Sequence, residues 1–135
     1  MKTIKLIPIL ACLIIAAPLL AADKPPVPSS VKNVGVEEFD KLRADKKNVV
    51  LDVRTPEEFA KGHIPGAVNV DFNAPDFQKK VAELDKSKTY LVHCAAGVRS
   101  AKACTVMDKT AFPSIVNLEP GFRAWEKAGK PVEKK

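Results

Sequence analysis

Residues 89–109 read TYLVHCAAGVRSAKACTVMDK, a strand-like segment followed by a loop and a helix-like segment. Its first part, Thr89 to Cys94, is an apolar run typical of a buried strand, and its last part, Arg99 to Lys109, has the pattern of a helix. A short loop that contains Gly97 joins the two. A strand that turns directly into a helix aims backbone N–H groups into the turn. Ligands of open α/β sheets bind at the carboxyl ends of the strands, so Cys94 is predicted to lie at a ligand site.

The chain on both sides of this stretch alternates between strand-like and helix-like segments. Apolar and β-branched runs predict three more strands, at residues 49–53, 67–72 and 115–118. Apolar residues at helical spacing predict helices at residues 36–42, 75–84 and 121–128. Thr55-Pro56-Glu57-Glu58 fits a capping box with proline at the first helical position, and predicts a helix that ends at Gly62. This alternation predicts an α/β fold, a parallel sheet with helices on both faces.

The composition excludes several classes of protein. The 135 residues are 46% hydrophobic and 28% charged, which is typical of one globular domain. Aromatic residues make up only 6%, which argues against a surface that stacks on bases. The formal net charge is +6, but Lys and Arg are interspersed with Asp and Glu along the chain. We therefore expect a solvated charged surface and no nucleic-acid partner.

The first 22 residues are predicted to be a secretory signal peptide. Two lysines precede an uncharged apolar run from Leu6 to Ala22, which closes on small residues. Residues 23–33 are rich in Pro and Ser and predict a tether to a domain at residues 34–133. We expect a periplasmic protein without stable membrane association after cleavage. An uncleaved anchor is the alternative, because the apolar run is close to the shortest length that spans a membrane.

Cys94 is the candidate nucleophile. The helix N-terminus and Arg99 would both favour the thiolate, which is the nucleophilic form of the side chain. The alternative interpretation is a small, buried apolar residue. His93 is expected to be a core histidine that faces away from Cys94, since neighbouring strand residues point to opposite faces. Cys104 is expected to pack against the sheet and not to act as a second thiol, although a disulfide to Cys94 stays open.

Three polar residues outside the loop are interpreted as structural. Asp52 and Arg54 alternate with Val53 at a strand end, so that both can face one side and form a buried ion pair. His63 precedes a Pro-Gly turn and is expected to brace that turn. The sequence has no CxxC pair and no Cys/His cluster with metal-ligand spacing, so that no metal site is predicted.

Four segments together resemble the single-domain rhodaneses, a family of sulfurtransferases. They are Val50-Leu51-Asp52-Val53-Arg54 with Pro56-Glu57-Glu58-Phe59, Gly62-His63-Ile64-Pro65-Gly66-Ala67, Cys94-Ala95-Ala96-Gly97-Val98-Arg99-Ser100, and Gly121 to Trp125. The second matches the family's GHIPGA turn and the third its CxxGxRS active loop. With the export signal, the chain looks most like the periplasmic phage-shock type. Pro120 stands where the family usually has Gly, which is expected to alter a turn and not the chemistry.

The resemblance implies a rhodanese fold, a five-stranded parallel sheet flanked by helices on both faces. It implies that Cys94 takes a sulfur atom from thiosulfate or another donor as a persulfide and passes it to cyanide or a thiol. Loop amides would stabilise the anionic sulfur, and Arg99 would hold the anionic donor. The loop residues implied to bind the substrate are Ala95, Ala96, Gly97, Val98, Arg99 and Ser100. No cofactor, no partner other than these small molecules, and a monomer are expected.

Two other functions compete with sulfur transfer. A phosphatase or arsenate reductase of the same superfamily would need five residues between the cysteine and the arginine, whereas four separate Cys94 from Arg99 here. The shorter loop suits a single sulfur atom better than a tetrahedral oxyanion. A non-catalytic persulfide carrier uses the same intact loop and stays open as the main alternative.

Overall fold

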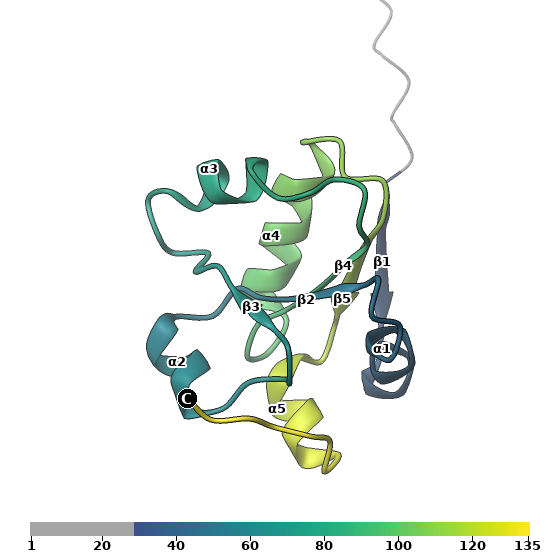
Figure 1. Ribbon diagram of the computed structural model, residues 1–135, viewed down its shortest axis with the longest axis vertical. Helices are drawn as coiled ribbons and strands as arrows, with labels where there is room; N and C mark the ends of the chain where they lie inside the picture. The colour runs from purple at the N-terminus through teal and green to yellow at the C-terminus, as the bar shows by residue number, and fades with distance from the viewer. Residues whose placement is uncertain (1–28) are drawn as a thin grey trace, which may run out of the picture.

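A computed structural model describes residues 29–135, and the expected signal peptide and most of the expected tether lie outside this range. Five strands form one sheet in the order β1-β5-β4-β2-β3, and every neighbouring pair is parallel. Figure 1 shows the helices placed around this sheet. The strands are β1 (Val31–Val34), β2 (Val49–Asp52), β3 (Val68–Asn69), β4 (Tyr90–His93) and β5 (Ile115–Leu118). The helices are α1 (Val36–Arg43), α2 (Pro56–Lys61), α3 (Phe77–Ala82), α4 (Val98–Asp108) and α5 (Gly121–Lys127).

Two hydrophobic cores cover the two faces of the sheet. On one face, side chains of α3 and α4 pack against the strands, with Phe77, Val81 and Met107 fully or almost fully buried. On the other face, α1 and α5 contribute Phe39 and Trp125 to a second cluster. Because both faces are covered, β4 and β5 are buried at every residue. The predicted α/β architecture, a parallel sheet with helices on both faces, is confirmed.

The structure differs from the sequence-based expectation at three elements. Three of the four residues of β1 lie in the stretch that is expected to be a tether, and residues 31–34 pair with residues 115–118 of β5. β3 is only two residues long, whereas the sequence predicts a strand over residues 67–72. α3 covers residues 77–82 and is shorter than the predicted helix over residues 75–84. In each case the end of the element depends on pairing or packing with distant parts of the chain, which local patterns do not contain.

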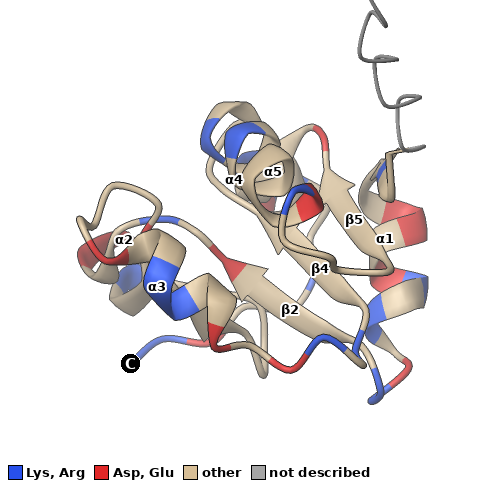
Figure 2. Ribbon diagram, turned by 90° about the horizontal axis from the view of Figure 1, so that it is seen from above, with Lys and Arg blue, Asp and Glu red and all other residues tan. Residues whose placement is uncertain are grey.

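Charges of both signs share the surface of the domain. Figure 2 shows Lys or Arg next to Asp or Glu on α1 and α2. Lys32 pairs with Glu38 and Arg43 with Asp40, so that opposite charges are neighbours on the surface at α1. Among residues 29–135, no helix is both long and apolar enough to cross a bilayer.

Candidate active site

Cys94 lies directly after β4, at the start of the loop that leads into α4. Its side chain is almost fully buried, at 1% exposure. Gly97 caps α4 with a φ of 96°, in the left-handed region that glycine enters without strain. This turn brings the Gly97 N–H to 3.1 Å from the Cys94 sulfur. Sγ also lies 3.4 Å from Ser100 Oγ, in the first turn of the helix. The loop therefore wraps around a single sulfur atom.

The surroundings of this sulfur favour the thiolate. Burial raises the pKa of Cys94, but hydrogen bonds from the Ser100 hydroxyl and from the amides of Ser100, Ala96 and Gly97 lower it by more. The net effect is a pKa below the ordinary value for a cysteine. These donors are part of the turn itself, which is how a helix N-terminus stabilises an anion. The loop itself thus shifts Cys94 toward the thiolate form.

Alkylation of Cys94 is expected to follow this pKa. Its rate with iodoacetamide should rise with pH and reach half of its maximum below the midpoint of about 8.5 that is usual for cysteine. Ser100→Ala removes the hydroxyl donor and should move the midpoint upward. Both midpoints can be measured by mass spectrometry of the peptide that contains Cys94. A wild-type midpoint at or above that of an unfolded control peptide would contradict the expectation.

The N-terminus of α5 supports the loop from outside. The N–H of Phe122 donates to the Cys94 carbonyl at 2.8 Å, and the N–H of Arg123 donates to the Ala95 carbonyl at 3.1 Å. Gly121 makes this approach possible, because a Cβ there would lie 2.4 Å from the Ala95 oxygen. Pro120 takes the N-cap position of α5 with a φ of −78°, close to the value that its ring requires. The family's usual glycine is therefore unnecessary at position 120, whereas Gly121 has no substitute.

Gly121→Ala is expected to distort the loop. The new methyl group would overlap the Ala95 carbonyl, and the φ of 76° adds strain for any L-residue. We expect a loss of about 2–4 kcal/mol of unfolding free energy and a much slower alkylation of Cys94. Gly129→Ala is the matched control, because Gly129 has a φ of 72° and its new methyl group would meet no atom within 4 Å. It should lose only about 1 kcal/mol, and equal losses in the two variants would show that no clash occurs.

Arg99 is held by Glu58, a residue that the sequence pattern places only in a helix cap. Its Nη1 and Nη2 donate to the two carboxylate oxygens of Glu58 at 2.7 and 3.0 Å. Glu58 Oε1 also lies 3.2 Å from Thr55 Oγ1, within the capping box of α2. Glu58 and Arg99 are 41 positions apart, so that only the fold brings them together. The capping-box pattern predicts that Glu58 lies at the start of a helix. No local sequence pattern predicts its contact with Arg99.

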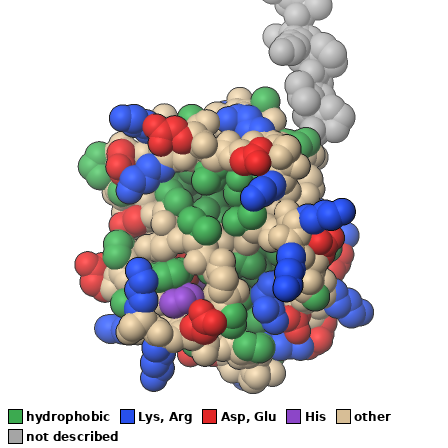
Figure 3. All heavy atoms as spheres, viewed as in Figure 1, with side chains coloured by type: hydrophobic (Ala, Val, Ile, Leu, Met, Phe, Trp, Pro, Cys, Tyr) green, Lys and Arg blue, Asp and Glu red, His purple; other side chains and the backbone are tan. Residues whose placement is uncertain are grey.

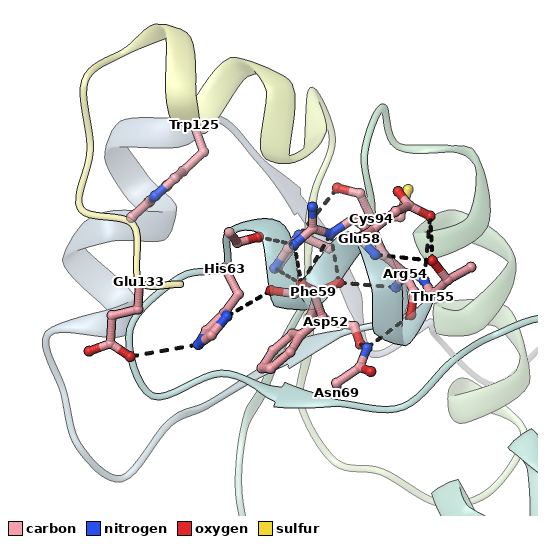
Figure 4. A network of polar contacts seen from close by, with 12 residues as sticks. Asp52, Arg54, Thr55, Glu58, Phe59, His63, Asn69, Cys94, Trp125 and Glu133 are labelled. Atoms are coloured by element: carbon pink, nitrogen blue, oxygen red, sulfur yellow. Dashed lines mark hydrogen bonds and ion pairs between the residues drawn. The ribbon is translucent and has the colours of Figure 1, made fainter. Parts of the chain in front are cut away.

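A buried polar cluster lies beneath the loop, as Figure 4 shows. Arg54 Nη2 donates to Asp52 at 2.6 Å and to the Gly62 carbonyl at 2.7 Å, and its guanidinium lies over the Phe122 ring. Both members of this ion pair are buried, as predicted from their alternation in the strand. His93 is fully buried on the opposite side from the Cys94 sulfur, between the rings of Phe39 and Phe122. Burial lowers the pKa of His93, which keeps it neutral.

His63 contacts the end of α2 and the C-terminal segment, and its predicted role in bracing the Pro65-Gly66 turn stays a prediction. Its Nδ1 lies 2.9 Å from the Phe59 carbonyl, and its ring stacks on Phe59. The backbones of His63 and Glu133 exchange two hydrogen bonds of 2.8 Å. A groove of about 490 Å³ lies beside His63, and none of its lining residues belongs to the Cys94 loop. On the face that Figure 3 shows, a histidine side chain reaches the surface near charged side chains of both signs.

The second cysteine of the domain, Cys104, has surroundings that differ from those of Cys94. Cys104 is buried on α4, and burial raises its pKa to about 12, so that it stays a thiol. Cys94 and Cys104 are both free, and no disulfide joins them. Within residues 29–135, no group of three His, Cys, Asp or Glu side chains is placed to hold a metal ion.

Comparisons with known proteins agree with this geometry. The family described as "Rhodanese-like domain" matches residues 35–128. Thiosulfate sulfurtransferase 16 of Arabidopsis thaliana is 38% identical over 122 residues, which cover 83% of this chain and 98% of that protein. A sulfurtransferase of Allochromatium vinosum is 30% identical over 103 residues, covering 76% of this chain and 94% of that one.

Solved structures show the same relationship. The crystal structure of a rhodanese-related protein from Thermoplasma volcanium matches with a TM-score of 0.70 and 30% identity, over 77% of this chain and 99% of that one. A rhodanese-like domain protein from Staphylococcus aureus matches with a TM-score of 0.65 and 33% identity, over 77% and 98% of the two chains. With its loop, its sheet order and these matches, the chain belongs to the rhodanese-like domain family.

Proposed function

We propose that this protein is a sulfurtransferase that moves sulfur from thiosulfate through a persulfide on Cys94 to cyanide or a thiol. The observation that carries the proposal is the Cys94 sulfur, which accepts the Gly97 N–H at 3.1 Å and has a lowered pKa. Sulfurtransferases among the relatives support sulfur transfer in general. The choice of thiosulfate and cyanide rests on the resemblance of the loop to that of rhodaneses.

The first half of the reaction loads the enzyme. The Cys94 thiolate attacks the outer sulfur of thiosulfate and forms a new S–S bond. The bond between the two sulfur atoms of thiosulfate breaks, and sulfite leaves with its electron pair. No proton is transferred, so that the step needs a thiolate and no general base. The loop amides then face a persulfide whose outer sulfur carries the negative charge, and hydrogen bonds to that charge stabilise it.

The second half restores the thiolate. Cyanide or a thiolate attacks the outer sulfur of the persulfide, and the Cys94 sulfur leaves with the electron pair. Thiocyanate or a new persulfide is the product. The two half-reactions share one covalent intermediate, so that we expect ping-pong kinetics. Arg99 lies in the first turn of α4, directly after the Cys94 loop, which supports a role for it at the donor's anionic end.

The length of the loop favours sulfur over phosphate chemistry. Only four residues separate Cys94 from Arg99, and three loop amides already converge on one sulfur atom. A phosphatase or arsenate reductase would need a wider loop to hold a tetrahedral oxyanion. A persulfide carrier without turnover would use the same loop and is separated from an enzyme only by experiment.

A single assay separates the three functions. The protein is incubated with thiosulfate, and its intact mass is measured before and after cyanide is added. A sulfurtransferase gains one sulfur atom, loses it to cyanide, and forms thiocyanate over many turnovers. A carrier gains the sulfur atom but forms no thiocyanate when cyanide is added. Hydrolysis of an aryl phosphate in place of sulfur loading would favour the phosphatase.

We further propose that the protein acts in the periplasm, as an exported sulfurtransferase of the phage-shock type. The basic start and the apolar run of residues 1–22 support this proposal. The mature N-terminus can be determined by mass spectrometry of the protein from a periplasmic extract. A first residue close to Asp23 is expected. Recovery of the full-length chain from the membrane fraction would instead favour an uncleaved anchor.

A further inference from the structure

We propose that Glu58 determines donor specificity: by pairing with Arg99 it makes the site discriminate against doubly charged sulfur donors. The inference rests on the proposed function and names a residue that sets which donor charge the site accepts. It follows from the position of Glu58, which lies at the start of α2 and contacts the only arginine of the Cys94 loop.

The Glu58 carboxylate is fixed from two sides. Its two oxygens accept hydrogen bonds from Arg99 in a bidentate arrangement, at 2.7 and 3.0 Å. Oε1 also contacts the Thr55 hydroxyl at 3.2 Å, and the Glu58 N–H donates to that hydroxyl at 3.3 Å. A bidentate pair of this kind has a defined geometry, unlike a single contact between flexible surface side chains. Arg99 therefore cannot turn toward a donor without leaving Glu58.

The pair also cancels charge next to the nucleophile. The hydrogen bonds from Arg99 are the largest cause that lowers the pKa of Glu58, to about 2, so that it is ionised at any physiological pH. A second arginine near the loop, Arg54, is neutralised by Asp52. Both guanidinium charges are thus compensated, and the Cys94 thiolate adds a negative charge of its own. An incoming dianion therefore meets the negative charge of the Cys94 thiolate. Neither Arg54 nor Arg99 carries a free positive charge that would offset this repulsion.

Two donors test this idea because they differ by one charge and share one reaction. Thiosulfate is a dianion, whereas methanethiosulfonate carries a methyl group in place of one oxygen and is a monoanion. In both, the Cys94 thiolate attacks the outer sulfur and the S–S bond breaks. Sulfite leaves from the first and methanesulfinate from the second, each with the electron pair of that bond. The ratio of kcat/KM for thiosulfate to that for methanethiosulfonate therefore reports the cost of the additional charge.

The decisive variant is Glu58→Gln. It removes the negative charge with little change in shape, and we expect the ratio to rise by roughly five- to tenfold at low ionic strength, mainly through a lower KM for thiosulfate. Salt should reduce the difference between variant and wild type, because screening weakens interactions of exposed charges. Arg99→Ala should shift the ratio in the opposite direction, since it leaves the Glu58 carboxylate uncompensated. Glu58→Asp keeps the charge and should keep the ratio within about twofold of wild type.

Two matched controls separate this effect from others. Glu57→Gln removes the same charge one position away, where the side chain is exposed, and should leave the ratio unchanged. Thr55→Ala removes the helix cap and one of the two contacts of the Glu58 carboxylate but keeps its charge, so that it should lower stability while the ratio stays within about twofold of wild type.

The outcomes are distinct from a failure of the proposed function. If Glu58→Gln lowers kcat/KM for both donors by the same factor, Glu58 only positions Arg99 and the inference is wrong. An unchanged ratio in both Glu58→Gln and Arg99→Ala would also overturn it, while sulfur transfer itself would stand. If the wild-type protein takes sulfur from neither donor, the proposed function fails instead.

Discussion

Cys94→Ser is expected to abolish sulfur transfer, with thiocyanate formation reduced by roughly a thousandfold or more. The change replaces one atom, and the loop amides can still donate to the hydroxyl oxygen. The variant should therefore fold, while its oxygen stays protonated at neutral pH and forms no persulfide. Intact mass after incubation with thiosulfate measures the effect directly, since no sulfur atom should be gained.

Cys104→Ala is the matched control for this variant. Cys104 is buried on α4 and has a raised pKa, so that it is expected to take no part in the reaction. Its replacement should keep sulfur transfer within about twofold and lower the unfolding free energy by about 1 kcal/mol, the cost of a small lost contact. Sulfur transfer that survives in Cys94→Ser but is lost in Cys104→Ala would mean that the nucleophile has been misidentified.

Asp52→Ala is expected to cause the largest loss of stability, about 3–5 kcal/mol of unfolding free energy. It leaves the buried Arg54 guanidinium without its carboxylate, while the Gly62 carbonyl and the Phe122 ring remain in contact with it. Isolated buried charge is costly because the low-polarity interior does not replace hydration. Such a loss is a large part of the total stability of a small domain. Urea denaturation would measure this loss of unfolding free energy. The slope of the unfolding free energy against urea concentration should be the same in variant and wild type.

An exposed ion pair provides the comparison. Glu38 pairs with Lys32 across the surface, with side-chain exposures of 48% and 66%. Glu38→Ala should cost less than about 1 kcal/mol, since water and salt already weaken such a pair. If Asp52→Ala were no more destabilising than Glu38→Ala, the Asp52–Arg54 pair would have to be hydrated. The prediction that this pair stabilises the fold would then be wrong.

Much of the active site follows from patterns that are local in the chain. The apolar run before Cys94 and the helix after Gly97 place the cysteine at the end of a strand, because period and turn residues act over a few positions. The alternation of Asp52 and Arg54 was enough to predict a buried pair, and the opposite orientation of His93 follows from the same period of two. In such cases, the residues concerned lie within a few positions of one another, in the same strand or helix.

Other features depend on contacts between segments that are far apart in the chain. Glu58 reads as a helix cap in the sequence, and its contact with Arg99 exists because β2 and β4 are neighbours in the sheet. Gly121 supports the loop because α5 approaches the carbonyl of Ala95, and β1 forms only where residues 31–34 meet β5. Backbone periodicity determines which residues share an element or a face. Contacts between elements depend on how the whole chain packs, and this sets both the charge beside Cys94 and the space around it.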